Sequence, residues 1–191
     1  MNMEEKRKAL QKLYNSFRQC NECPYQKNDD DHRVFGAGNL NARILFIGEA
    51  PGEQEDTEKK PFVGRAGKLL NNCMQKAGFK REDVFITNIV KCRPPNNRTP
   101  LPEEITPELK ELLKKEIEII QPKVICTLGA TAAQALLNKK VSMSALRGTF
   151  SPYDHMILMH TYHPAYIFRN RNAESELVKD LFQAFELSKK S

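Results

Sequence analysis

The sequence has no long hydrophobic run. None of its 191 residues belongs to an apolar stretch that approaches the roughly 20 residues of a membrane-spanning helix. The N-terminal segment, residues 1–17, is typical of an amphipathic helix and lacks the apolar core of a secretory signal. We therefore expect a cytoplasmic protein with no membrane partner. Disulfides are not expected in that compartment, so the five cysteines need another explanation.

Repeats and low-complexity tracts are also lacking. The length suits one domain with a single core, and we expect residues 1–191 to form it. The formal charge of +6 and the pI near 9.0 favour a polyanionic partner such as nucleic acid. The alternative is a set of solvated lysine side chains with no such partner.

Apolar and amphipathic segments alternate along the chain. Buried strands are predicted at residues 43–47, 84–87, 123–128 and 156–160. Helices are predicted at residues 3–19, 64–77, 107–120 and 174–188, and a further helix begins after the turn at Gly129. The polar stretch 53–61 is predicted to be irregular. This alternation predicts an α/β fold, a three-layer α/β/α sandwich with a central parallel sheet of about four strands.

Small polar segments follow each of the four predicted strands. In open parallel α/β sheets, ligands bind at the carboxyl ends of the strands. We therefore expect these segments to converge on one pocket, which is the predicted active site. They are Gly48-Glu49-Ala50-Pro51-Gly52, Asn88, Gly129-Ala130-Thr131 and His163-Pro164-Ala165.

Several of these side chains can take part in chemistry. Glu49, Glu55 and Asp56 could position a water molecule, bind a metal or transfer protons, although a solvated acidic loop is the alternative. The segment lacks the Gly-Lys-Ser/Thr ending of a Walker phosphate loop. The amide of Asn88 offers a donor and an acceptor to the edge of a base. His163 could stabilise developing negative charge or transfer a proton.

A loop of apolar and basic residues follows the last predicted strand. Tyr166, Ile167 and Phe168 lie next to Arg169 and Arg171. Such a combination suits insertion of apolar side chains into a stack of bases beside contacts to phosphate. The alternative is that the aromatic side chains pack on the core.

The cysteines divide into two groups. Cys20 and Cys23 form a CxxCP turn whose spacing suits two thiolate ligands of one metal centre, and Cys92 in a proline-stiffened loop is a plausible third ligand. Ordinary thiols at a helix end are the alternative. Cys73 and Cys126 lie on apolar faces and are predicted to be small buried hydrophobic residues.

Together these segments resemble the family 4 uracil-DNA glycosylases, the iron–sulfur branch of that superfamily. The matching segments cover nearly the whole chain: CxxCP, VFGAGN, ILFIGEAPGEQED, PFVGRAGKLLN, VFITNIVKCRPPNNRTPLP, LGATAA, LRG and HPAYIFRN. The resemblance implies a DNA-repair enzyme that flips uracil out of single- or double-stranded DNA and hydrolyses its bond to deoxyribose, leaving an abasic site. It also implies a nucleoid-associated monomer.

The resemblance assigns roles at the uracil. Phe62 is implied to stack on the flipped base, Asn88 to hydrogen-bond its edge, and Glu55 to lie near the 5-position, where the methyl group of thymine must be refused. Glu49 is implied to orient or activate the water. His163 is implied to hydrogen-bond the 2-carbonyl as negative charge builds on the departing uracil.

The resemblance also implies contacts beyond the reacting atoms. Amides where a helix begins can bind a phosphate, and a loop can enter the duplex beside them. The implied contacts are Gly48 and Ala50 with uracil, Gly129, Ala130 and Thr131 with a phosphate, and Tyr166, Arg169 and Asn170 with DNA.

The chain departs from the family in its cysteines. The family holds a [4Fe-4S] cluster with four cysteines, and Glu108 occupies the position of the fourth. Three outcomes are open: a cluster on Cys20, Cys23 and Cys92 with Glu108 or water as the fourth ligand, a three-iron cluster, or no cluster. We favour a cluster because one non-cysteine ligand is chemically tolerable. We expect it to tie the N-terminal segment, about residues 3–24, to the core.

Three other functions compete with this prediction. A relative that traps uracil covalently would use a histidine in the loop after Cys92, and residues 96–102 contain none. A DNA-binding protein that has lost catalysis would not need Glu49, Asn88 and His163 together. A zinc-stabilised binding module would use the same three cysteines with an unidentified fourth ligand, and metal analysis separates it from an iron–sulfur protein.

Overall fold

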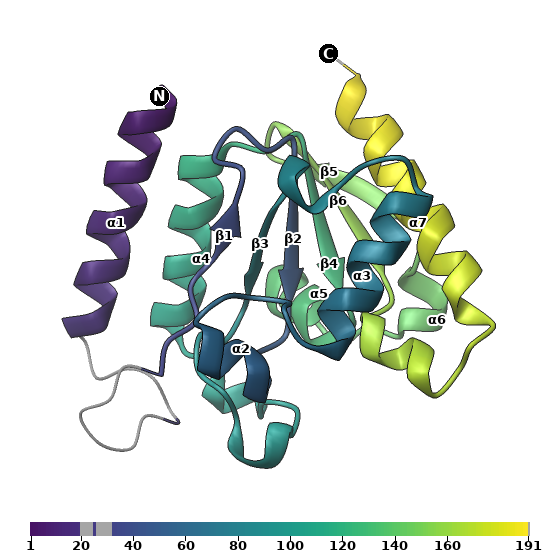
Figure 1. The fold of residues 1–191 in the computed structure, drawn as a ribbon, viewed down its shortest axis with the longest axis horizontal. Helices are drawn as coiled ribbons and strands as arrows, with labels where there is room; N and C mark the ends of the chain where they lie inside the picture. Colours follow the sequence, from purple (N-terminus) through teal and green to yellow (C-terminus); the bar gives the residue numbers. More distant parts are fainter. Residues whose placement is uncertain (20–24, 26–31, 191) are drawn as a thin grey trace.

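Six strands form one sheet at the centre of the molecule (Figure 1). The computed structural model describes residues 1–19, 25 and 32–190. In the order β1-β3-β2-β4-β6-β5, the inner strands β3, β2, β4 and β6 are parallel, and β1 and β5 pair antiparallel at the edges. The strands are β1 (Ala37–Gly38), β2 (Ile44–Gly48), β3 (Phe85–Asn88), β4 (Val124–Leu128), β5 (Phe150–Tyr153) and β6 (Met156–Thr161).

Helices cover both faces of the sheet, which confirms the predicted three-layer α/β/α architecture (Figure 1). In the described part of the chain, no helix is both long and apolar enough to cross a membrane. The α-helices are α1 (Met3–Gln19), α2 (Glu53–Glu58), α3 (Arg65–Lys76), α4 (Pro107–Ile120), α5 (Ala130–Leu137), α6 (Met143–Leu146) and α7 (Ala173–Lys189). Short 3-10 helices are η1 (Arg81–Asp83), η2 (Pro95–Asn97), η3 (Pro102–Glu104) and η4 (Pro164–Phe168).

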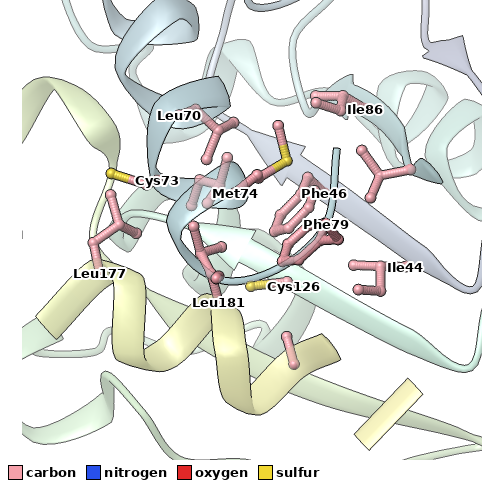
Figure 2. Packing of buried hydrophobic residues seen from close by; sticks show 14 of the residues in the cluster. Ile44, Phe46, Leu70, Cys73, Met74, Phe79, Ile86, Cys126, Leu177 and Leu181 are labelled. Carbon is pink, nitrogen blue, oxygen red and sulfur yellow. The ribbon is translucent and has the colours of Figure 1, made fainter. Parts of the chain in front are cut away.

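The alternation of side chains along each strand divides the core into two layers. Ile44 and Phe46 of β2 point toward α3 and α7, whereas Leu45 and Ile47 point toward α4 and α1. Figure 2 shows the first layer, in which Phe46 lies beside Phe79 and the buried side chains of α3 and α7 close over them. Cys73 and Cys126 are buried there as free thiols, as predicted.

The four parallel inner strands are those that were predicted. Two antiparallel edge strands were not predicted, and the prediction of an irregular stretch at residues 53–61 was wrong in part. The two missed strands are edge strands with weak signals: β1 has only two residues, and β5 is largely exposed and contains Pro152. The missed helix is α2. Acidic side chains in its first turn stabilise it through the positive end of the helix dipole, and Glu55 accepts a hydrogen bond from the Gly52 amide.

A buried ion pair joins one face of the sheet to the helices that cover it. Lys91 Nζ lies 2.7 Å from Glu116 Oε2, and both side chains are fully buried. The same ammonium donates to Thr87 Oγ1 of β3 and to the carbonyl of Asn88. Glu116 of α4 also accepts a hydrogen bond from the hydroxyl of Tyr14 in α1. Three segments that are distant in sequence, α1, the end of β3 and α4, therefore meet at one carboxylate.

Replacement of Glu116 by leucine should leave the Lys91 ammonium buried without its partner. We expect Glu116→Leu to lower the free energy of unfolding by about 3–5 kcal/mol, measured by urea denaturation. Glu118→Leu on the exposed side of α4 is the matched control, because Glu118 only approaches Lys114 at 3.9 Å in solvent; its effect should be within about 0.5 kcal/mol. Equal effects of the two variants would contradict the role of the buried pair.

Candidate active site

An open cavity of about 580 Å³ lies where β2 and β3 end and the loop after β6 begins. The register pairs Gly48 with Asn88, so the last residues of β2 and β3 lie side by side. The cavity brings together eight of the residues singled out in the sequence: Glu49, Ala50, Glu55, Phe62, Asn88, His163, Tyr166 and Arg169. Three of the four segments that were expected to converge therefore line this cavity, and the segment at residues 129–131 does not.

Asn88 presents a free amide to this cavity. Its side chain is only 1% exposed, and neither Oδ1 nor Nδ2 has a hydrogen-bond partner among the described residues. Buried polar groups are nearly always paired, and leaving one unpaired costs on the order of 1–3 kcal/mol. The arrangement is that of a binding group whose partner arrives with a ligand.

Gly48 allows Phe62 and Asn88 to approach each other. A Cβ atom at Gly48 would lie 2.5 Å from the Phe62 ring and about as close to Asn88 Oδ1. The Phe62 ring is buried, and its centroid lies 5.7 Å from that of His163. An aromatic face and an amide therefore meet on the same wall of the cavity, which suits a planar heterocycle.

The carboxylate of Glu55 holds two loops together. Oε1 accepts hydrogen bonds from the amides of Val63, at 2.9 Å, and Gly64, at 2.7 Å. Oε2 accepts from the amide of Gly52 at 3.2 Å. The side chain is 9% exposed and lines the cavity. Its position is thus set by the backbone around it.

Thr131 lies beside Glu49. Its hydroxyl donates to Glu49 Oε2 at 2.5 Å, across 82 residues of sequence. Thr131 was singled out as a phosphate contact together with Gly129 and Ala130, and none of these three is among the residues that line the cavity in the described chain. Gly129 has φ of +91°, and a Cβ there would lie 2.9 Å from His163 Cβ. The start of α5 therefore packs against Glu49 and His163.

His163 is held as a neutral hydrogen-bond donor. Its Nδ1 accepts the amide hydrogen of Ala165 at 3.1 Å, so the ring proton of the neutral form resides on Nε2. Loss of water around the ring lowers the pKa of His163 from 6.5 to about 4, although the carboxylate of Glu55 acts in the opposite direction. At neutral pH the ring can donate from Nε2 without carrying a charge.

The loop after His163 combines two kinds of residue. Tyr166 and Phe168 line the cavity, whereas Ile167 is fully buried in the core, so the prediction that Ile167 forms part of an inserting wedge was wrong. Asn170 donates from its side chain to the Tyr166 hydroxyl. The guanidinium of Arg65 lies over the Phe168 ring, 4.3 Å from its centroid.

Some lining residues were missed in the sequence. They are polar or basic residues of loops and helix ends: Arg65, Asn97, Arg98 and Thr99. Their signal was weak because basic residues are spread along the whole chain. The guanidinium of Arg98 also forms a salt bridge with the carboxylate of Glu104, at 2.6 Å.

The structure places one of the three candidate metal ligands. Cys92 is buried, forms an antiparallel bridge with Arg33, and lines a second cavity of about 360 Å³ with His32 and Asp56. Cys20 and Cys23 lie outside the described residues. Glu108 is exposed in the first turn of α4.

The titration of His163 can be measured directly. We expect NMR of the imidazole to show a midpoint at about pH 4 and, above it, a proton on Nε2. Because the unfolded chain binds this proton at about pH 6.5, this residue should lower stability progressively as the pH falls from 6.5 toward 4. The resonance is assigned by its loss in His163→Gln. A midpoint near 6.5 would contradict the desolvated site.

Comparison with known proteins identifies the family. The model of the uracil DNA glycosylase superfamily matches residues 35–186. The type-4 uracil-DNA glycosylase of Thermotoga maritima is 46% identical over 179 residues, which cover 91% of this chain and 91% of that protein. The type-4 enzymes of Saccharolobus solfataricus and Archaeoglobus fulgidus are 44% and 37% identical, over 90% and 94% of this chain and 82% and 93% of their own lengths. The chain therefore belongs to the uracil-DNA glycosylase superfamily, and within it to the type-4 enzymes.

Proposed function

We propose that this chain excises uracil from DNA in repair, by hydrolysis of the bond between the base and deoxyribose, and that the cavity at the strand ends binds the flipped base. The observation that carries the assignment of the pocket is the unpaired, buried amide of Asn88 beside Phe62. A flipped base is read by hydrogen bonds to its edge and by stacking on aromatic side chains, and this wall supplies both.

Asn88 can match the edge of uracil. Its Oδ1 would accept from N3–H and its Nδ2 would donate to O4. Cytosine presents the opposite pattern at these two positions, so the amide orientation that fits uracil leaves cytosine with unfavourable contacts. Glu55, held by three backbone amides, would stand near the 5-position and exclude the methyl group of thymine sterically.

Glu49 and His163 would act at the bond that breaks. The transition state resembles an oxocarbenium sugar and a uracil anion. The neutral His163 would donate from Nε2 to O2 as negative charge develops there; a donor of this kind is typically worth about 3–4 kcal/mol. Glu49, oriented by the Thr131 hydroxyl, would hold the attacking water and receive its proton.

DNA would bind across the rim of the cavity. Arg65 and Arg169 line it and can contact phosphates, consistent with the net charge of +6. Tyr166 and Asn170, which are hydrogen-bonded to each other, would enter the duplex from the loop after His163. Single-stranded DNA can occupy the same rim because the contacts to phosphate do not require a second strand.

An iron–sulfur cluster is the cofactor that the family implies. Cys92 fits this group, because it is buried beside a cavity of about 360 Å³ and thiolates are the usual ligands of such clusters. Cys20, Cys23 and Cys92 would hold the cluster, with Glu108 or water as the fourth ligand. The cluster would be structural and would tie the N-terminal segment to the loop after β3.

Excision can be tested on a labelled DNA duplex that carries one uracil, with alkali to break abasic sites. We expect strand scission that depends on uracil and falls by about 100-fold or more in Asn88→Ala, since the variant loses both contacts to the base. Asn41→Ala, in an exposed turn before β2, is the matched control and should keep full activity. Duplex binding without scission by the unaltered protein would indicate a catalytically silent relative.

The cluster can be tested by metal analysis after anaerobic purification. We expect iron and sulfide in the unaltered protein and a loss of both in Cys92→Ser. Glu108→Cys should raise the iron content and the stability of the cluster in air, because it supplies a fourth thiolate. Zinc in place of iron would indicate the binding-module alternative, and a colourless protein without metal would exclude the cluster.

A further inference from the structure

Phe62 has a strained backbone. Its φ is +54°, in the left-handed region that bulky residues rarely adopt. Such a conformation persists only where the surrounding structure imposes it, and it is often found at functional sites. The contacts that hold Phe62 in place therefore bear on the shape of the pocket.

Arg81 supplies one of these contacts. Its Nη2 donates to the carbonyl of Pro61 at 2.7 Å, and its Nη1 donates to the carbonyl of Phe62 at 3.3 Å. The fork of the guanidinium thus spans two consecutive carbonyls. Within the described residues, no carboxylate lies within 4.0 Å of Arg81, and the guanidinium donates its hydrogen bonds to this stretch of backbone.

The segment that carries Arg81 is itself well anchored. Phe79 and Val84, on either side of η1, are buried in the core. The ring of Phe79 stacks in parallel with those of Phe46 and Phe185. Arg81 therefore extends from a well-packed segment to the backbone of Pro61 and Phe62.

Gly67 of α3 lies in close contact with the backbone of Phe62. A Cβ at Gly67 would lie 2.0 Å from the carbonyl oxygen of Phe62 and 2.2 Å from its carbonyl carbon. The carbonyl of Phe62 thus lies between the Arg81 guanidinium and the first turn of α3. This leaves the peptide little freedom to rotate out of the left-handed conformation.

We propose that Arg81 is a positioning residue for uracil recognition, which holds the Phe62 ring in its stacking orientation by binding the carbonyls of Pro61 and Phe62. The inference rests on the proposed function, because it requires that Phe62 stacks on uracil. Arg81 is not among the described residues that line the cavity, so it would act on the base through Phe62 alone. Its loss should affect the binding of the base and leave the binding of undamaged DNA unchanged.

A double-mutant cycle tests this role. Free uracil, a neutral probe, is used as a competitive inhibitor of excision by the full-length protein. We expect Arg81→Met to weaken uracil inhibition by about 10-fold, within the range for loss of one stacking contact, while its affinity for DNA without uracil stays within about twofold. Phe62→Ala should weaken inhibition at least as much. Arg81→Met added to Phe62→Ala should have no further effect on uracil inhibition, because the ring that Arg81 positions is absent from that background.

Arg43→Met is the matched control for lost charge. Arg43 is exposed and precedes the first residue of β2, whereas the cavity lies at the other end of that strand. This variant should leave uracil inhibition unchanged. Gly67→Ala should imitate Arg81→Met, since the added methyl group displaces the Phe62 carbonyl from the other side. Thermal melting of each variant shows whether it is folded.

The outcomes separate the two proposals. Normal uracil inhibition in Phe62→Ala would contradict stacking and with it the proposed pocket. Impaired Phe62→Ala with normal Arg81→Met would overturn the role of Arg81 alone, as would an Arg81→Met effect that persists in full in the Phe62→Ala background. If Arg81→Met does not fold, Arg81→Lys takes its place in the cycle; it keeps the charge but loses the fork that spans both carbonyls.

Discussion

The ion pair between Lys91 and Glu116 joins the fold to the pocket. Burial of two charges costs several kcal/mol per ion unless hydrogen bonds complete the shell around them. Here the shell includes Thr87, Tyr14 and the carbonyl of Asn88. Burial lowers the pKa of Lys91, and the adjacent carboxylate opposes that shift. The requirement to complete this shell fixes α1, α4 and the end of β3 relative to one another.

This constraint explains how the unpaired amide of Asn88 is tolerated. The backbone of Asn88 is held on one side by its register with Gly48 and on the other by the Lys91 ammonium. It cannot shift to give its own side chain a partner. The unpaired amide of Asn88 destabilises the fold, and the other interactions of the fold offset this cost. The amide therefore stays available to a ligand.

Hydrogen bonds fix polar side chains around the cavity in the absence of any ligand. Backbone amides orient Glu55, a hydroxyl orients Glu49, and an amide selects the tautomer of His163. A site arranged in this way need not reorganise as charge develops in the reaction. The close approach of β2 to Phe62 adds to this order, because the lack of a side chain at Gly48 lets the ring lie directly against the strand.

The sequence by itself determined the four inner strands, because strands covered on both faces are almost continuously apolar. It also determined which polar residues follow them. It did not reveal β1 or β5, whose edge positions need no apolar run, or that α2 forms around the carboxylate of Glu55. Only the tertiary structure decided that the Thr131 hydroxyl donates to Glu49 and that the Arg81 guanidinium donates to the carbonyls of Pro61 and Phe62. Each of these contacts joins segments that are distant in the chain, and local sequence preferences carry no information about such distances.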